Sequence, residues 1–420
     1  NNFKNIDLVI VNFYPFEETI RETSSHKKII EKIDIGGPAL VRAAAKNYND
    51  VTVITSINQY NELILQLRKN RGSTDEEFRK RMSQEAFSET AYYDSLIANY
   101  FNKINLNQFP QKKIFHSKLI EKLRYGENPH QKSAIYSLDN SLNLKQISGK
   151  KLSFNNFNDI YSALTISNSL PNNTGVVIIK HANPCGVSIL QNKLKCYQAA
   201  LACDPISAFG GVVSCNFKID TKIAKELNKI FLEVVIGNKF EKEALKILKR
   251  KKNLRIIDSS NLSFDQEFKI NSLNNTILIQ NENKIKFNPS NFKVVSKNKP
   301  SRELMENLVF AFNVCRYTKS NAIVLGHNKS TVGIGSGQPS RIDSCQIAID
   351  KMKKFTNPLK NIVAASDAFF PFVDGIEKLV QSGISAVIQP SGSINDKKVI
   401  KFANDTGTIL VFSKTRHFRH

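Results

Sequence analysis

The 420-residue sequence has no tryptophan, only three methionines and six cysteines, and no C-x-x-C pair. Scattered cysteines are typical of reduced thiols in a cytosol and argue against a disulfide framework or a zinc knuckle. No apolar run approaches the roughly 20 residues of a membrane helix, and no signal peptide opens the chain. We therefore expect a cytoplasmic protein without a membrane segment, of two or three domains at roughly 100–200 residues each.

Acidic residues are also scarce, since 37 Asp and Glu stand against 60 Lys and Arg and leave a formal net charge of +23. Such a balance could indicate a nucleic-acid-binding protein. The lysines are spread along the whole chain, however, and no aromatic-basic nucleic-acid motif is present. We favour a generally cationic surface that attracts small anionic substrates, with nucleic-acid binding as the alternative.

One stretch near the middle of the chain has a pattern typical of an active site. Residues 175–179 form a continuous apolar run, which predicts a strand buried on both faces. Lys180 and His181 follow, before Asn-Pro and Gly break the chain, and strand ends are where open α/β sheets bind ligands. The Lys180 ammonium disfavours the imidazolium of His181 and keeps it available as a base. A strand end that merely faces water explains this stretch equally well.

Helix and strand patterns alternate along the chain and predict an α/β fold. Strands at 6–13 and 51–55 lie among helical segments at 17–33, 39–46, 58–70 and 75–103. Two strands are too few for a stable parallel sheet, and the first residue is not Met. Residues 1–115 are therefore expected to be the second half of an α/β domain, and a small complete helical domain with a two-stranded ribbon is the less favoured alternative. The Asn- and Lys-rich residues 104–116 are expected to be a linker.

Regular α/β alternation continues to the end of the chain, with a polar, Asn-rich segment at 258–300. Strands are predicted at 175–179, 211–215, 322–325, 331–334, 362–365, 386–388 and 408–411. Helices are predicted at 157–169, 193–202, 220–231, 240–251, 301–316, 341–354, 374–382 and 395–404.

Three further loops carry polar clusters. The glycines of 204–211 would let a ligand approach the backbone. The Gly-rich stretch 333–341 is neither a dinucleotide fingerprint nor a P-loop, but its N–H groups and Arg341 could bind an anion. A strained turn explains it equally well. Residues 366–374 place three Phe around two carboxylates, which suits either a flat heterocycle or aromatic core packing.

The stretch His-Ala-Asn-Pro-Cys-Gly at 181–186 invites comparison with the zinc deaminase signature H-x-E…P-C-x-x-C. Asn183 replaces the general-acid Glu, and no second Cys lies three residues after Cys185. A zinc hydrolase is therefore disfavoured on ligand count, although stoichiometric zinc in the protein would revive it.

Taken together, these stretches closely resemble one family, the bifunctional AICAR formyltransferase/IMP cyclohydrolase of purine biosynthesis. The motifs that carry the resemblance lie at 12–16, 33–37, 123–131, 180–186, 207–211, 316–321, 337–341, 366–372 and 416–420. They stand in the family's order and span essentially the whole chain.

The resemblance implies a methylglyoxal-synthase-like parallel-sheet domain, present only as its C-terminal half over residues 1–115, which would belong to the cyclohydrolase. Residues 116–420 would form the formyltransferase domain, built from two zinc-free cytidine-deaminase-like α/β subdomains at about 116–285 and 286–420. This domain would transfer the formyl group of 10-formyltetrahydrofolate to the 5-amino group of AICAR. The product, FAICAR, is then cyclised to IMP.

The resemblance also implies roles for individual residues. His181 is expected to accept a proton, Lys180 to stabilise the transition state, and Asn321 to orient the amine or the formyl oxygen. Lys46 matches the catalytic lysine of the cyclohydrolase. The positions that match AICAR contacts are Arg124, Tyr125, Gly210, Glu233, Arg341, Phe369 and Arg416. The guanidinium groups of the arginines are suited to bidentate hydrogen bonds with the nucleotide phosphate. Folate contacts are expected at Ile342, Asp374, Ser393 and Ile394, and cyclohydrolase nucleotide contacts at Asn12, Tyr14, Asp34 and Ile35.

Family members are homodimers with shared transferase sites, so a homodimer is implied here, as is room for a bound potassium ion. Two departures from the family pattern concern one region: Glu233 stands where some members have Asp, and Ile-Gly-Asn at 236–238 replaces Ile-Ala-Pro. The other cyclohydrolase loops of the family precede residue 1. We therefore expect cyclisation to IMP to be impaired while formyl transfer persists.

Overall fold

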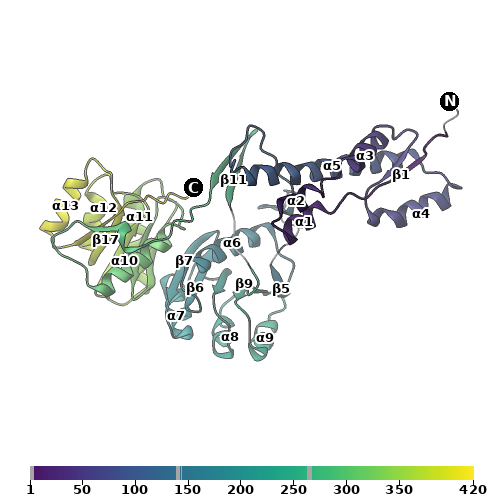
Figure 1. Ribbon diagram of the computed structural model, residues 1–420. Coiled ribbons are helices and arrows are strands. Elements are labelled where there is room, and N and C mark those ends of the chain that lie inside the picture. The colour runs from purple at the N-terminus through teal and green to yellow at the C-terminus, as the bar shows by residue number, and fades with distance from the viewer. Residues whose placement is uncertain (1–3, 139–141, 143, 263–266) are drawn as a thin grey trace. The chain divides into compact units, whose positions relative to one another are not determined.

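The computed structural model describes residues 4–138, 142, 144–262 and 267–420, and the chain divides into two compact units (Figure 1). Unit 1 consists of Asn1–Glu121 with Ile135–Ser141, and unit 2 of Lys122–Ala134 with Leu142–His420. A separate two-stranded sheet, β3 (Lys118–Leu123) and β4 (Ser133–Ser137), forms where the chain passes from one unit to the other. None of the described helices is long and apolar enough to cross a membrane.

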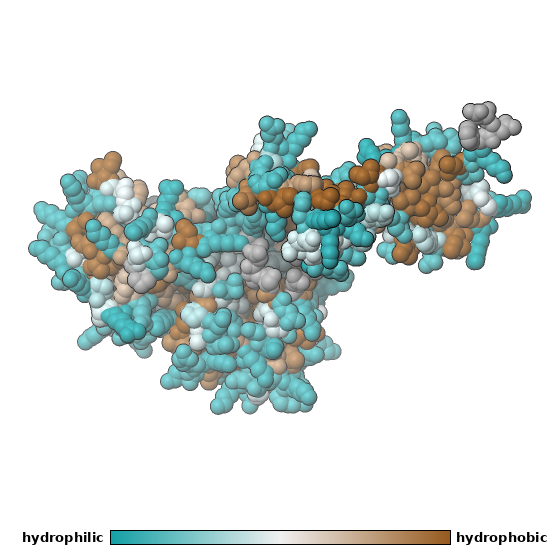
Figure 2. Space-filling view, viewed as in Figure 1, coloured by the Kyte–Doolittle hydropathy of each residue, from teal (hydrophilic) through white to brown (hydrophobic). Residues whose placement is uncertain are grey.

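Unit 1 has a two-stranded parallel sheet and mostly helical surroundings. The strands β1 (Leu8–Ile10) and β2 (Thr52–Ile54) pair in parallel, with Val53 and Ile54 buried. The helices are α1 (Phe16–Glu22), α2 (His26–Ile30), α3 (Gly36–Lys46), α4 (Tyr60–Lys69) and α5 (Glu76–Ile104), with a 3-10 turn, η1, at Ile57–Gln59. Hydrophobic side chains remain on the surface of this unit (Figure 2), among them Ile10 and Leu65, which are 46% and 64% exposed.

Unit 2 is organised around one twelve-stranded mixed sheet. Its order is β13-β18-β17-β16-β14-β15-β7-β6-β8-β9-β10-β5. The strands are β5 (Lys145–Ser148), β6 (Gly175–Lys180), β7 (Asn183–Ile189), β8 (Gly211–Cys215), β9 (Leu232–Gly237), β10 (Arg255–Asp258), β13 (Phe292–Val294), β14 (Ile323–His327), β15 (Ser330–Gly335), β16 (Ile362–Ser366), β17 (Ile384–Pro390) and β18 (Ile409–Ser413). The helices are α6 (Phe154–Ser169), α7 (Lys193–Cys203), α8 (Thr221–Leu227), α9 (Lys242–Lys249), α10 (Arg302–Cys315), α11 (Arg341–Phe355), α12 (Asp374–Gln381) and α13 (Asp396–Asp405).

The sheet is built from the same arrangement twice. The first repeat, β5 to β10, and the second repeat, β13 to β18, each follow the order strand, helix, hairpin and then three helix–strand steps. Each has an antiparallel hairpin, β6–β7 or β14–β15, followed by three parallel strands and an antiparallel outer strand. In Figure 1 the first repeat is teal and the second green to yellow. The repeats join where β7 meets β15 at Ser188 and Ser330.

The structure corrects several sequence-based expectations. Residues 17–33 form two helices, because Thr23 and Ser25 adopt extended backbone between α1 and α2. The chain does not break after His181: residues 183–189 are strand β7, since a tight turn returns the chain to the sheet. The polar segment 258–300 holds a hairpin, β11 (Phe268–Leu273) and β12 (Thr276–Asn281), and a 3-10 turn, η2 (Pro289–Asn291). The prediction of a mixed α/β fold is confirmed.

Candidate active site

The predicted catalytic pair lies at the turn of the β6–β7 hairpin. The strand residues Ile178 and Ile179 are almost fully buried, whereas His181, at the turn, is exposed. His181 and Ala182 have φ values of 51° and 58°, the left-handed conformation of a two-residue hairpin turn. Non-Gly residues other than Asn, Asp and His rarely adopt it, so the backbone at Ala182 is disfavoured and must be held by its surroundings.

Gly210 brings the backbone close to Lys180. The Lys180 Nζ donates to the Gly210 carbonyl over 2.9 Å, and Gly210 has a φ of +69°. A Cβ at this position would lie 3.0 Å from the same Nζ. Glycine is therefore needed both for its backbone conformation and for the space that the ammonium occupies.

A cavity of about 350 Å³ opens beside this turn. It brings together five residues that the sequence predicted separately: Tyr125, Lys180, His181, Gly210 and Glu233. They come from the loop after β3, the hairpin turn, the segment before β8 and strand β9. The remaining lining residues are Lys150, Ser153, Asn155, Asn156, Asp159, Phe231, Leu232, Asn253 and Arg255.

Sequence reasoning missed three residues that hold this site in shape. Glu233 accepts a hydrogen bond from Asn156 Nδ2 (2.8 Å) and lies 3.3 Å from Arg255 Nη1. Asp159 Oδ1 accepts the Ala182 N–H over 2.6 Å. Burial raises the pKa of the Asp159 carboxyl, while the bond from Ala182 and the charges of His181 and Lys180 oppose that rise. No motif marked these positions, because they act only through residues distant in sequence.

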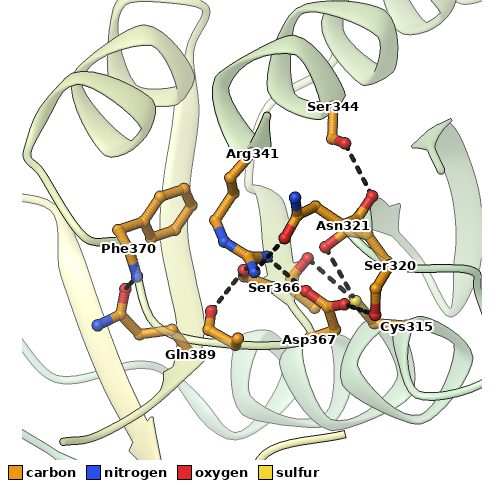
Figure 3. A network of polar contacts seen from close by, with 12 residues as sticks. Cys315, Ser320, Asn321, Arg341, Ser344, Ser366, Asp367, Phe370 and Gln389 are labelled. Carbon is orange, nitrogen blue, oxygen red and sulfur yellow. Dashed lines mark hydrogen bonds and ion pairs between the residues drawn. The ribbon is translucent and has the colours of Figure 1, made fainter. Parts of the chain in front are cut away.

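Asn321 and Arg341 belong to a second cluster, in the second repeat (Figure 3). The Arg341 guanidinium donates to Ser366 Oγ (2.8 Å), to the Asp367 carboxylate and to Asn321 Oδ1 (2.7 Å). Asp367 is fully buried and also accepts from Ser320 Oγ over 2.5 Å. The Arg341 guanidinium thus contacts three protein side chains in this structure, and its expected role as a phosphate fork stays a prediction.

The two clusters meet through Asn183. Its Oδ1 accepts the Lys319 N–H over 3.4 Å, and its Nδ2 donates to the His181 carbonyl over 3.2 Å. The loop before Asn321 therefore lies beside the turn that carries His181. Long-range pairing of the two repeats, which no local pattern reveals, creates this arrangement.

The other predicted contacts of unit 2 are spread around the second repeat. Asp374 accepts the N–H of Gly375 at the start of α12, and Ser393 Oγ accepts the Asn395 N–H. Ile394 is fully exposed, and the Arg416 guanidinium lies over the Phe418 ring at 4.4 Å. Arg124 is exposed, whereas Ile342 and Phe369 are half-buried. The three Phe of 366–374 differ, since Phe370 is buried and Phe372 is 64% exposed.

Unit 1 brings part of the predicted cyclohydrolase set together. Asp34 accepts the N–H groups of Tyr14 (3.3 Å) and Gly37 (2.7 Å), so it connects the end of the β1 segment to the start of α3. Ile35 follows it and is 77% exposed. Asn12 Nδ2 donates to Tyr60 Oη at 3.4 Å, and Lys46 is exposed at the end of α3.

Two other features bear on ligands. Another cavity, of about 1340 Å³, runs along α10 and the end of α6 and is lined by none of the predicted site residues. Within the described ranges, no group of three or more His, Cys, Asp or Glu is arranged to hold a metal ion.

Comparison with known proteins identifies the family. Residues 44–351 match the family model described as AICARFT/IMPCHase bienzyme. The chain belongs to this family. It is 43% identical to the bifunctional purine biosynthesis protein PurH of Aquifex aeolicus, and the matched region covers all of this chain and 83% of the relative. The corresponding protein of Thermoanaerobacter sp. is 44% identical over 99% of this chain and 82% of its own length. That of Listeria monocytogenes is 41% identical over 100% of this chain and 83% of its own length.

Membership of the AICARFT/IMPCHase family confirms the resemblance inferred from the motifs. The chain is thus a bifunctional enzyme of purine biosynthesis, of the AICAR formyltransferase and IMP cyclohydrolase type. The roles of individual residues stay predictions.

Proposed function

We propose that unit 2 transfers the formyl group of 10-formyltetrahydrofolate to the 5-amino group of AICAR in the cavity beside the β6–β7 turn. The observation that carries this proposal is the convergence of Lys180 and His181 with Tyr125, Gly210 and Glu233 around one cavity. A base, a fixed cation and a polar lining are what acyl transfer to a weak nucleophile needs.

The chemistry follows from the nucleophile. The amine of AICAR is weak because its lone pair is delocalised into the ring and the carboxamide. As its nitrogen bonds to the formyl carbon, His181 takes up the proton that the amine loses. The carbon–N10 bond of the folate then breaks, and His181 gives the proton to N10 as it leaves.

Lys180 is suited to stabilising the oxyanion of that intermediate. Its ammonium has three N–H donors, and one is used by the Gly210 carbonyl. The other two remain for the developing negative charge, while the bond to Gly210 fixes the position of the nitrogen. A donor that is held before the reaction begins has no reorganisation cost in the transition state.

The finer assignments belong to the same proposal. Asn321 would orient the reacting groups, with Arg341, Phe369, Arg416 and Arg124 on the nucleotide side. Ile342, Asp374, Ser393 and Ile394 would contact the folate. We further infer that two deaminase-like subdomains correspond to the two repeats and that the reaction uses no zinc. We also infer that the protein binds a potassium ion, for which we name no ligands. Metal analysis and the dependence of the rate on potassium test the last two inferences.

Unit 1 would carry the cyclohydrolase residues Lys46, Asn12, Tyr14, Asp34 and Ile35. A cytoplasmic homodimer completes the proposal, and the six buried, unpaired cysteines are consistent with a reducing compartment. Light scattering of the purified protein tests the dimer.

The decisive experiment compares His181→Ala and Lys180→Ala with the parent, following formyl-folate consumption and IMP release separately. Loss of the base should lower kcat for formyl transfer by about 10²–10⁴-fold. Asn328→Ala is the matched control, because Asn328 occupies the equivalent turn position of the β14–β15 hairpin with φ 45°. Near-normal formyl transfer in either site variant contradicts the proposal. Lys46→Ala should affect IMP release alone.

A further inference from the structure

In the twelve-stranded sheet, the turns of the hairpins β6–β7 and β14–β15 are each tied to the preceding helix by the same kind of bond. The Ala182 N–H donates to Asp159 Oδ1 over 2.6 Å, and the Lys329 N–H donates to Asn307 Oδ1 over 2.8 Å. Asp159 and Asn307 are each the sixth residue of their helices, α6 and α10. Each bond holds the second residue of a left-handed turn, with φ values of 58° and 53°.

The two anchors differ in charge. In the second repeat a neutral amide oxygen holds the turn, so the anchor alone does not require a carboxylate. A carboxylate in this half-buried position has a desolvation cost, which raises the pKa of Asp159. The first repeat nevertheless has the charged group, and its turn is the one that carries His181. A role beyond holding the backbone explains the difference.

The charges that face His181 make that role specific. Lys180 on β6, Arg255 on β10 and Lys150 before α6 are cations that line the same cavity. The other lining carboxylate, Glu233 on β9, is bonded to Asn156 and Arg255. Tyr125 is the remaining titratable group of the lining. An imidazolium formed at His181 would be repelled by these cations, and Asp159 is the carboxylate joined to its own turn.

We propose that Asp159 is a positioning residue for formyl transfer, which both anchors the His181 turn and offsets the positive charge that His181 gains when it accepts the proton. This inference rests on the proposed function, in which His181 is the base. The Asp159 carboxylate stabilises the imidazolium that His181 forms in that step.

The repeat supplies the test variant. Asp159→Asn gives the first turn the anchor of the second, so the protein should keep its thermal unfolding midpoint. We expect kcat for formyl transfer to fall about tenfold, with KM for AICAR changed less than about twofold. The acidic limb of the pH–rate profile should move to lower pH, because the imidazolium loses a stabilising negative charge. Asn307→Asp, the reciprocal change, should leave kcat and the profile unaltered, and Asp159→Ala should lower the unfolding midpoint as well.

A double variant separates the possible failures. In a His181→Ala background, Asp159→Asn should cause no further loss, because the charge acts through His181. An unchanged kcat and pH profile in Asp159→Asn, or an equal loss in both backgrounds, overturns the role of the charge. Full activity of His181→Ala would instead overturn the assignment of the base, whatever Asp159 does.

Discussion

The two repeats of unit 2 have the same order of elements, yet their polar groups serve different ends. In the first repeat, Lys180 and His181 stand at the mouth of a cavity, and His181 is exposed. In the second, Arg341 and Asp367 are buried and bonded to each other. The same arrangement of elements thus presents exposed polar groups in the first repeat and buries a bonded ion pair in the second.

The comparison also shows how the scaffold tolerates this division. The turn positions of His181 and Ala182 are occupied in the second repeat by Asn328 and Lys329, all with positive φ. Asn and His are both enriched in that conformation, whereas Ala182 and Lys329 are not. Both repeats therefore hold a disfavoured residue at the second turn position, and only the first carries a proposed catalytic group beside it.

The largest predicted effect on stability concerns the buried pair of the second repeat. Asp367→Asn leaves the Arg341 guanidinium charge buried without its counter-ion, with the Arg341 side chain 8% exposed and that of Asp367 0%. We expect the free energy of unfolding to fall by about 3–5 kcal/mol. Urea unfolding followed by circular dichroism measures this, since the chain has no tryptophan to report by fluorescence.

The matched change in the first repeat is Glu233→Gln. The Glu233 side chain is 40% exposed and lies 3.3 Å from Arg255. Solvent screens this pair, so the same measurement should give a loss below about 1 kcal/mol. Equal losses from the two variants would mean that the division between a buried support and an open site is wrong.

The second prediction concerns the buried histidine of the second cluster. His417 is 1% exposed, its ring contacts Phe287 and Phe312, and its backbone N–H donates to the Asp367 backbone carbonyl. Burial, and then the charge of Arg316, lower the pKa of His417 to about 4, with Asp367 opposing. The unfolded chain therefore binds the proton more tightly than the folded one.

The sign of the pH effect follows. The contribution of neutral His417 to stability is complete above pH 6.5 and is lost as the pH falls from 6.5 to about 4, by about 3 kcal/mol. His417→Gln should remove this part of the acid sensitivity, whereas His130→Gln, at an exposed position, should retain it. Unfolding free energies at pH 7.5, 5.5 and 4 would decide, and an unaltered pH dependence in His417→Gln contradicts the account.

The sequence predicts many of the individual helices and strands, but it does not predict how they assemble. Apolar runs such as 175–179 identified several of the buried strands, because burial on both faces leaves a continuous hydrophobic signal. Strand β7 was missed, since its Asn-Pro start is typical of a turn, and the buried strands β9 and β10 were also missed. Motifs identified His181 and Lys180, but Asp159 and Arg255 became visible only through contacts across the fold. Local patterns carry no information about which distant side chains satisfy a polar group.

The third prediction tests whether the repeats are equivalent where no chemistry is proposed. Gly186 on β7 and Gly333 on β15 each face the eighth residue of the following helix, Ala200 of α7 and Ala348 of α11. A Cβ at these glycines would lie 1.9 Å and 2.1 Å from the facing carbonyl oxygens. Each helix must therefore move away from its strand in the alanine variant.

Gly186→Ala and Gly333→Ala should each lower the free energy of unfolding by about 1–3 kcal/mol, to a similar extent, because overpacking a well-packed contact has this cost. Gly36→Ala, where no atom lies within 4 Å of the new Cβ, is the control and should be neutral. Similar losses would show that the scaffold imposes the same requirement in both repeats and that they differ only in the groups carried at their turns. A clear loss of unfolding free energy in one repeat alone would show that the repeats also differ in how the helix packs on the sheet. The difference between the repeats would then not be confined to turn residues such as His181 and Asn328.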